Sequence, residues 1–274
     1  MSLLTIDKDK CKQDGLCAAE CPTQVIRFEG KGSYPEMVPN GESMCLRCGH
    51  CVAVCPHGAL DHAQVPQADC PPIDKALAVS EAQAEQFLRS RRSVRRFKAR
   101  PVETEILQRL IEIARYAPTS SNMQLVEWTV IYDRERLSEL SGQVIQWMRG
   151  IMEADPQCKA MPYLPTLVKA WDAGADVVLR SAPCLVTAMA PAQDRNGMVN
   201  LTLALSYLEL AAPVFGLGTC WAGLLQGAMM SSPALKQLAG IPQDYPFHYP
   251  MMVGYSNVNY YRLPQRKAPK IRWQ

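Results

Sequence analysis

The pattern of apolar and polar positions divides the 274-residue chain into two unlike parts. Residues 1–65 hold few large apolar side chains, so a module of this size buries little surface and is marginal alone. Residues 65–72, V-P-Q-A-D-C-P-P, are proline-rich and without periodicity, which is typical of a linker. We therefore predict a small module with its linker over residues 1–72 and a larger domain over residues 73–274.

The larger part shows the periodicities of both helices and strands. Ser80 has the character of a helix N-cap, and Phe87 and Leu88 would share one face of the helix that follows. Apolar residues recur at helical spacing between 106 and 114, and residues 199–215 are apolar nearly all round, which predicts a core helix. The remaining predictions are strands over 127–132, 182–188 and 250–255, and an end to the core helix at 216–223.

Seven of the eleven cysteines fall in two runs near the N-terminus. The later run, residues 45–56, reads C-x2-C-x2-C-x3-C-P. Bacterial-type ferredoxins hold iron–sulfur clusters with this spacing, and the fourth cysteine of such a run ligates the other of two clusters. Structural zinc sites instead pair two C-x2-C units across a longer spacer. The spacing therefore favours iron–sulfur over zinc, and bound metal would supply much of the module's folding free energy.

The earlier run, residues 11–22, repeats the later one at an offset of 34 positions. Three cysteines have counterparts at this offset, and Asp14 stands where the later run has Cys48. The repeat continues beyond the cysteines, because Val25-Ile26 corresponds to Ala59-Leu60. This internal duplication resembles the dicluster ferredoxin module over roughly residues 1–65.

The resemblance implies crossed ligation of two clusters. One cluster would take Cys45, Cys48, Cys51 and Cys21, and the other would take Cys11, Cys17, Cys55 and the residue at position 14. Three interpretations of Asp14 stay open. Asp14 ligates a fourth iron in a [4Fe–4S] cluster; or that iron is labile and a [3Fe–4S] cluster remains, since a carboxylate is a harder ligand than a thiolate; or Asp14 is a turn residue before Gly15 and does not contact iron.

Composition restricts the possible partners and the compartment of the protein. A hydrophobic content of 48% allows a sizeable core, and a net charge of +3 is too small to indicate binding to nucleic acid or to a membrane surface. We expect no signal peptide in residues 1–10 and no stretch of transmembrane length. Eleven cysteines without a secretion signal indicate a reducing compartment, so we expect a cytoplasmic protein. The four cysteines outside the runs are expected to be buried small hydrophobic residues: Cys70, Cys158, Cys184 and Cys220.

Four separated motifs in the larger part agree in type and order with one family. They are R-R-S-x-R-x-F at 91–97, A-P-T-S-S-N-x-Q at 117–124, G-L-G-x-C-W-x-G at 216–223, and G-Y at 254–255 followed by a basic P-x-R-K tail at 264–267. Residues from about 80 to 274 resemble the FMN-dependent nitroreductase family. A dinucleotide fingerprint at 216–221 is rejected, because the third glycine is missing and the segment follows a predicted helix.

The resemblance implies an α+β fold, with an antiparallel-rich central sheet flanked by helices and a small ferredoxin-like iron–sulfur domain before it. It also implies a homodimer formed through the long core helix, with FMN at the interface. Arginine forks bind phosphate through parallel hydrogen bonds, so Arg91, with Ser93, would clamp the FMN phosphate together with the basic tail. The residues that the resemblance assigns to FMN are Arg91, Arg92, Ser93, Arg95, Ser120, Asn122, Gln124, Trp221, Ala222, Gly223, Arg266 and Lys267.

Individual roles follow from the same resemblance. Arg92 and Arg95 would reach the ribityl chain or the pyrimidine edge of the flavin, where a cation stabilises its reduced anion. Asn122, which has a donor and an acceptor, would read the pyrimidine edge from the partner subunit. Trp221 to Gly223 would pass beside the flavin with a backbone N–H facing N5.

These expectations describe a flavin-dependent oxidoreductase that passes electrons through iron–sulfur clusters to FMN and on to a small organic acceptor of the nitroaromatic or quinone type. No catalytic acid or base is expected, because the chemistry belongs to the cofactor. The donor is left open between NAD(P)H and an external ferredoxin. The alternatives are an electron-transfer or redox-sensing protein without an organic substrate, and a related chemistry such as reductive dehalogenation or flavin breakdown.

Overall fold

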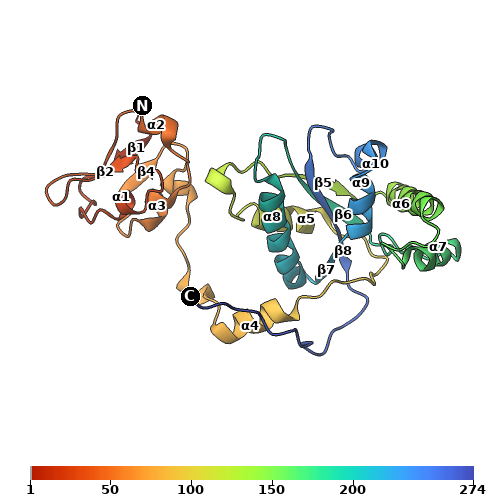
Figure 1. Ribbon diagram of the computed structural model, residues 1–274. Coiled ribbons are helices and arrows are strands. Elements are labelled where there is room, and N and C mark those ends of the chain that lie inside the picture. The colour runs from red at the N-terminus through yellow and green to blue at the C-terminus, as the bar shows by residue number, and fades with distance from the viewer. Residues whose placement is uncertain (1) are drawn as a thin grey trace. The chain divides into compact units, whose positions relative to one another are not determined.

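The computed structural model describes residues 2–274 and contains two compact units. The first unit comprises the chain up to Val79 together with Ser121–Met123, and the second comprises Ser80–Ser120 and Gln124–Gln274 (Figure 1). Each unit has its own apolar core and is described by itself.

The first unit is built from two short antiparallel strand pairs and three short helices. Its core is small and gathers around Leu4, Val25, Ile26, Val52 and Leu60. The strand pairs are β1 (Leu4–Ile6) with β4 (Leu60–His62) and β2 (Ile26–Arg27) with β3 (Glu36–Met37), and the helices are α1 (Leu16–Ala19), α2 (Gly41–Met44) and α3 (His50–Val54).

The sequence duplication is visible in the backbone of this unit. Helices α1 and α3 each begin immediately after a glycine in the left-handed region, Gly15 with φ of 71° and Gly49 with φ of 73°. These two glycines are 34 positions apart, which is the offset of the cysteine runs. Because left-handed backbone favours glycine, the same turn is built twice, and it leads into the helix that carries Cys17 in one run and Cys51 in the other.

The segment between the last strand of the first unit and the second unit has little regular structure. It contains two 3-10 turns, η1 (Gln67–Asp69) and η2 (Lys75–Leu77). The second unit begins with α4 (Glu81–Ser90), where Ser80 accepts a hydrogen bond from the backbone of Gln83 and the Gln83 side chain returns one to Ser80. This capping box confirms the predicted helix start at Ser80.

A four-stranded sheet of order β5-β6-β8-β7 forms the centre of the second unit, and every neighbouring pair is antiparallel. All residues of β6 are buried, so this strand carries the middle of the core. The strands are β5 (Glu127–Ile131), β6 (Cys184–Ala190), β7 (Leu217–Trp221) and β8 (Phe247–Tyr255).

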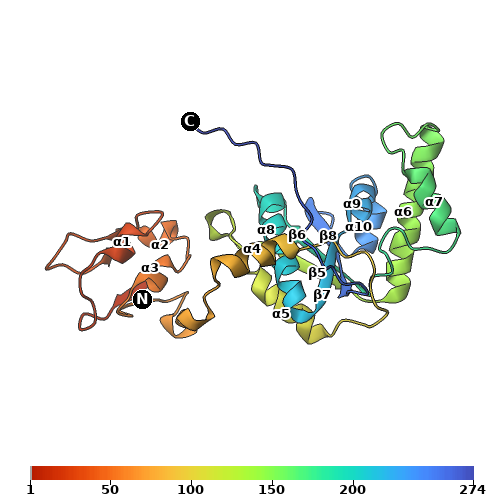
Figure 2. The ribbon, with the colours of Figure 1, turned by 90° about the horizontal axis from the view of Figure 1, so that it is seen from below.

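Helices cover both faces of this sheet, as Figures 1 and 2 show. One face packs against α5 (Thr104–Ala114) and α8 (Gly197–Ala211), which continues into the 3-10 helix η4 (Ala212–Phe215). The opposite face packs against α6 (Arg134–Ala154), α7 (Leu164–Asp172), α9 (Gly223–Met229) and α10 (Pro233–Leu238). The predicted α+β fold, a central antiparallel sheet flanked by helices, is confirmed.

Three features differ from the sequence expectation. Residues 217–221 form strand β7, although the segment was expected only to end the core helix. Helices α6 and α7 lie in a stretch for which no element was predicted. Cys70 is exposed, whereas the other three cysteines outside the runs are buried as expected.

The expectation that no stretch reaches the length of a transmembrane helix is wrong, because one helix is long and apolar enough when only length and composition are considered. Residues Gly197–Phe215 form a helical stretch of 19 residues with a mean hydropathy of 1.4, which passes that test. This stretch packs against α5 and against strands β6 and β8. Its apolar character is that of a core helix, and such helices pass the same test.

Candidate functional site

Two cavities in the first unit separate the cysteines into two sets. The first, which we call the Cys45 cavity, is lined by Cys45, Cys48, Cys51 and Cys21. The second, the Cys11 cavity, is lined by Cys11, Cys17, Cys55 and Asp14. Each cavity takes three residues from one run and one cysteine from the other run. These are the two ligand sets that crossed ligation implies.

The arrangement suits a cluster better than a single ion. All eleven cysteines are free, so no thiol is consumed by a disulfide. Among residues 2–274, no three His, Cys, Asp or Glu side chains converge closely enough to hold one metal ion. The thiols instead surround a space, as the ligands of a multi-iron cluster must, because each thiolate binds a different iron.

Burial and backbone donors shape the chemistry of these thiols. Burial raises the pKa of Cys51 to about 11 and also raises the pKa of Cys17. Metal ligation requires thiolates, so cluster assembly must release these protons. The backbone N–H of Arg47 lies 3.4 Å from Cys45 Sγ, and that of Ala59 lies 3.3 Å from Cys55 Sγ. These amides can donate to a thiolate once it forms.

The position of Asp14 is compatible both with a turn role and with contact to a cluster. Its Oδ1 accepts a hydrogen bond from the Leu16 backbone at 3.2 Å, which is a turn role before α1. Its carboxylate also lines the Cys11 cavity, and Oδ2 lies 3.6 Å from Nε2 of His57, another residue of that cavity. The turn role therefore does not exclude contact with iron. His57 is a neighbour that sequence reasoning missed, because the four histidines are scattered along the chain.

The arginine segment of the second unit is fixed against strand β7. Ser93 forms an isolated parallel bridge with Thr219, and the Val94 backbone N–H donates to the Thr219 carbonyl at 2.8 Å. This approach requires a glycine in the strand, because a Cβ built on Gly218 would lie 2.4 Å from a methyl group of Val94. Arg91 and Arg92 precede this contact along the chain, and Arg95 follows it.

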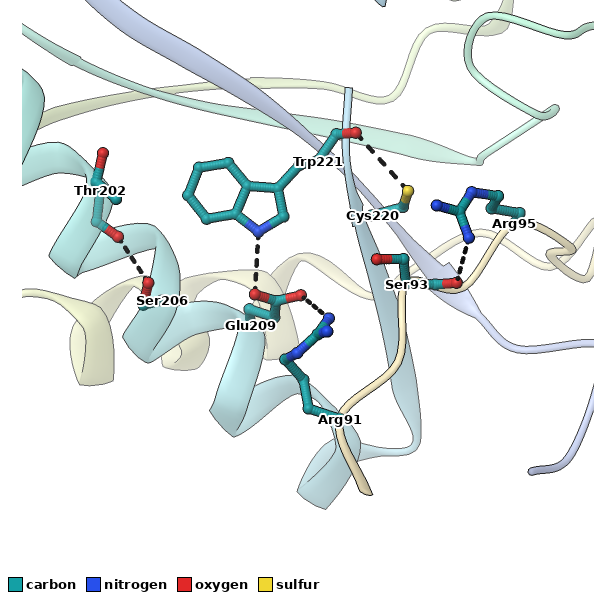
Figure 3. A network of polar contacts seen from close by, with 8 residues as sticks. All are labelled: Arg91, Ser93, Arg95, Thr202, Ser206, Glu209, Cys220 and Trp221. Atoms are coloured by element: carbon teal, nitrogen blue, oxygen red, sulfur yellow. Dashed lines mark hydrogen bonds and ion pairs between the residues drawn. The ribbon is translucent and has the colours of Figure 1, made fainter. Parts of the chain in front are cut away.

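Glu209 of α8 links two of the predicted flavin residues (Figure 3). One of its carboxylate oxygens accepts a hydrogen bond from Arg91 at 2.8 Å, and the other accepts from the Trp221 indole at 3.0 Å. The side chain of Glu209 is 8% exposed, so this charge is buried and needs both partners. Sequence reasoning missed Glu209, since a single carboxylate inside a nearly all-apolar helix carries no motif.

A cavity of about 250 Å³ opens beside Arg91 and Arg92. Its wall joins the arginine segment to the end of α8, to β7 and to the start of the C-terminal tail, where Asn259 and Tyr260 lie. The guanidinium of Arg92 lies 5.9 Å from the centre of the Tyr260 ring. Arg266 and Lys267 follow along the tail but do not line this cavity, and both are exposed.

Trp221 to Gly223 connect β7 to α9. The Trp221 ring meets the Tyr249 ring edge-on, with centroids 5.0 Å apart. The Ala222 backbone N–H donates to the Pro250 carbonyl at 2.9 Å, so within this segment the N–H of Ala222 is already paired. Cys220 lies next to Ser93 and Arg95 (Figure 3), and burial raises the pKa of its thiol, which makes it a poor nucleophile.

The 117–124 motif forms a strained loop. Ser121, Asn122 and Gln124 all have positive φ, at 53°, 54° and 51°. Non-glycine residues in this region cost free energy and gather at functional sites. The Ser120 backbone N–H is held by the Asn200 side chain at 3.2 Å, whereas Asn122 belongs to the first compact unit. Gln124 does not line the cavity beside Arg91 and Arg92, and the flavin roles of Asn122 and Gln124 stay predictions.

Comparison with known proteins agrees with this geometry. The model of the nitroreductase family matches residues 88–255, and the model of the 4Fe-4S dicluster domain matches residues 7–59. A curated protein of Archaeoglobus fulgidus, provisionally named an NADH dehydrogenase/NAD(P)H nitroreductase, is 23% identical over 67% of this chain and 92% of its own.

Solved structures show the same fold at low sequence identity. A nitroreductase with bound FMN from Bacteroides fragilis aligns with a TM-score of 0.57 and 18% identity, over 71% of this chain and 100% of its own. A nitroreductase with bound FMN from Desulfitobacterium hafniense aligns with a TM-score of 0.56 and 19% identity, over the same shares. The chain thus belongs to the nitroreductase family and carries a 4Fe-4S dicluster domain ahead of its nitroreductase domain.

Proposed function

We propose that this protein is a flavin-dependent reductase in which electrons pass through two iron–sulfur clusters to FMN and on to a small organic acceptor of the nitroaromatic or quinone type. The observation that carries the proposal is that the predicted ligand residues line cavities in both units. One cavity gathers four cysteines and the other gathers three cysteines with Asp14, and the unit with the nitroreductase fold has a cavity lined by Arg91 and Arg92. The two functional domains are proposed as residues 1–72 and 73–274.

In this proposal Arg91 and Arg92 hold the FMN phosphate. Two guanidinium groups at one cavity wall can bind a phosphate, although Glu209 of the same wall offsets part of their charge. Ser93, which follows them in the chain, is proposed to add a hydroxyl. Glu209 keeps one edge of Arg91 fixed and leaves its other N–H groups available. Arg266 and Lys267 follow the part of the tail that lines the cavity, and we propose that they close over the phosphate.

Bound FMN would supply the step between one-electron donors and a two-electron acceptor. The chain's own part is binding and orientation. Arg95, Ser120, Asn122 and Gln124 are proposed to contact the flavin with Trp221, Ala222 and Gly223. The edge-on contact with Tyr249 and the bond to Glu209 fix the orientation of the Trp221 ring.

For the clusters, we propose one [4Fe–4S] cluster in the Cys45 cavity. The Cys11 cavity would hold either a [4Fe–4S] cluster with Asp14 as a ligand or a [3Fe–4S] cluster. The thiols and the carboxylate of each cavity are suitable donors, and the free state of all eleven cysteines fits a reducing compartment such as the cytoplasm.

We further propose a homodimer with FMN at its interface and Asn122 supplied by the partner subunit. Support comes from helix α8, on which Met198, Val199 and Tyr207 are exposed although the helix is apolar. A surface of this kind is typical of an interface between subunits. The donor is proposed to be either NAD(P)H or an external ferredoxin.

Anaerobic turnover tests the proposal. The protein would be reduced with dithionite, freed of excess reductant, and mixed with a nitroaromatic compound or a quinone while the flavin and cluster absorbances are followed. The proposal predicts that both signals reoxidise as the acceptor is consumed, in an amount that matches the electrons stored on the protein, and that further dithionite renews the reaction. Reoxidation by oxidised ferredoxin, without reaction toward any organic acceptor, would instead support an electron carrier without its own substrate.

A further inference from the structure

His62 is a buried histidine inside the Cys45 cavity, outside the predicted ligand sets. It ends strand β4, where it pairs with Leu4 of β1, and its side chain is part of the cavity wall. The residue is 1% exposed. A buried polar ring needs hydrogen-bond partners, and the partners of His62 define which of its nitrogens carries the proton.

The tautomer of His62 follows from two backbone contacts. The N–H groups of Gln64 and Val65 both point at Nδ1 of the ring, each at 3.1 Å. A backbone N–H can only donate, so Nδ1 must offer its lone pair, and the proton of the neutral ring is on Nε2. Nε2 lies 3.6 Å from Sγ of Cys45, which places an N–H donor against that sulfur.

We propose that His62 donates an N–H···S hydrogen bond to the Cys45 thiolate and thereby raises the reduction potential of the cluster in the Cys45 cavity. The inference rests on the proposed binding of that cluster. Reduction adds negative charge that is shared with the cluster's sulfur ligands, so a donor at sulfur stabilises the reduced state more than the oxidised state. His62 is thus a positioning and tuning residue, and iron would be bound by the four cysteines.

The internal duplication supplies a comparison within the same chain. At the offset of 34 positions, the counterpart of His62 is Phe28, whose ring has no N–H to donate. Cys45 therefore has a side-chain donor that the repeat does not provide for its counterpart, Cys11. The two clusters are made electronically unequal by a residue that lies outside the cysteine runs.

The potential of each cluster tests the proposal. Full-length protein with its clusters would be titrated under EPR for the wild type, His62→Leu and His62→Gln. Leucine removes the donor, so we expect the reduction potential of the cluster in the Cys45 cavity to fall. The reduced-to-oxidised ratio of that cluster at a fixed potential should drop about tenfold, which is a shift of about 59 mV for a one-electron couple. Glutamine keeps an N–H near the position of Nε2 and should restore most of the shift.

His50→Gln is the matched control, because His50 lines the same cavity but is exposed. It should leave both potentials unchanged. The proposal is overturned if His62→Leu retains its iron and titrates like the wild type, or if both clusters shift equally.

A second measurement detects the contact in the wild-type protein and uses the variants only to assign it. Wild-type protein labelled with ¹⁵N-histidine would be reduced and measured by electron spin echo envelope modulation, which detects nitrogen coupled to a paramagnetic cluster. We expect a ¹⁵N coupling that persists in His50→Gln and is lost in His62→Gln, whose amide carries no label. Iron without histidine coupling overturns this inference alone, whereas wild-type protein that binds no iron overturns the proposed function as well.

Discussion

Arg91 and Glu209 form a partly buried ion pair, with a guanidinium nitrogen 2.8 Å from a carboxylate oxygen, although 118 positions separate the two residues in the chain. The pair joins the arginine segment to the core helix α8. It also makes any substitution of Arg91 ambiguous, because removal of the arginine would both delete a phosphate ligand and strand a buried carboxylate.

A double substitution separates these two effects. Arg91→Ala should weaken FMN retention about ten- to a hundredfold, since a charge-assisted hydrogen bond contributes roughly 1.5–3 kcal/mol. Arg91→Ala combined with Glu209→Gln removes the stranded charge but does not restore a phosphate ligand. We expect the double variant to regain stability while FMN retention after dialysis stays low. If retention returned to the wild-type level, Arg91 would be only a partner of Glu209.

The approach of the arginine segment to β7 should depend on Gly218. Gly218→Ala would place a methyl group within 2.4 Å of Val94, and overpacking of this kind costs about 1–3 kcal/mol. We expect lower stability and weaker FMN binding, because Arg91 and Arg92 would be displaced with Val94. Gly150→Ala is the control, since nothing lies within 4 Å of a Cβ at that position. Equal FMN binding by the two variants would contradict this role of Gly218.

Asp14→Cys tests the fourth position of the Cys11 cavity. A thiolate at this place would complete the pattern of the later run, so we expect a full [4Fe–4S] complement and a changed EPR spectrum. Asp14→Asn, which keeps the turn oxygen but weakens iron binding, should give a [3Fe–4S] signal. Iron content and EPR spectra that match the wild type in Asp14→Cys would show that position 14 does not contact iron.

His248 should make the nitroreductase unit sensitive to acid. Burial, with the nearby Lys236 charge, lowers the pKa of His248 to about 4, so the folded protein keeps this ring neutral. An unfolded histidine titrates near 6.5. Between those two values the unfolded state binds a proton that the folded state does not, so stability falls as the pH falls through this window, by on the order of 2–3 kcal/mol.

The measurement is denaturant unfolding of the full chain at pH 7 and pH 5, followed by tryptophan fluorescence. All five tryptophans belong to the second unit, so the signal reports on that unit alone. His248→Gln keeps a polar side chain beside Gln226, which lies 3.1 Å from the His248 ring nitrogen, and removes the titration. A pH dependence as large in the variant as in the wild type would rule out His248 as the cause.

Local patterns predicted much of the fold. The helix start at Ser80, the core helix and the strands near 127, 184 and 250 depend on caps and periodicity that operate over a few residues. Strand β7 was missed because the glycines at 216 and 218 have the composition of a turn. Gly218 is there for a contact with Val94, and no local pattern reveals a partner 124 positions away.

The candidate sites show the same division. Cysteine spacing predicted the two ligand sets that line the two cavities, because the duplication can be recognised from the sequence itself. Glu209, His57 and His62 were not predicted, because each becomes meaningful only through a partner that the fold brings close. A useful signal existed for His62: at the repeat offset, it is a polar residue in the place of Phe28.

The most direct test of the central claim is the content of flavin and iron per chain in protein purified without oxygen. The account predicts one FMN and about seven or eight irons, with the exact number reporting the state of the Asp14 position. Iron without flavin would contradict the reductase and leave an electron carrier on a nitroreductase fold. Flavin without iron would contradict the two cluster sites.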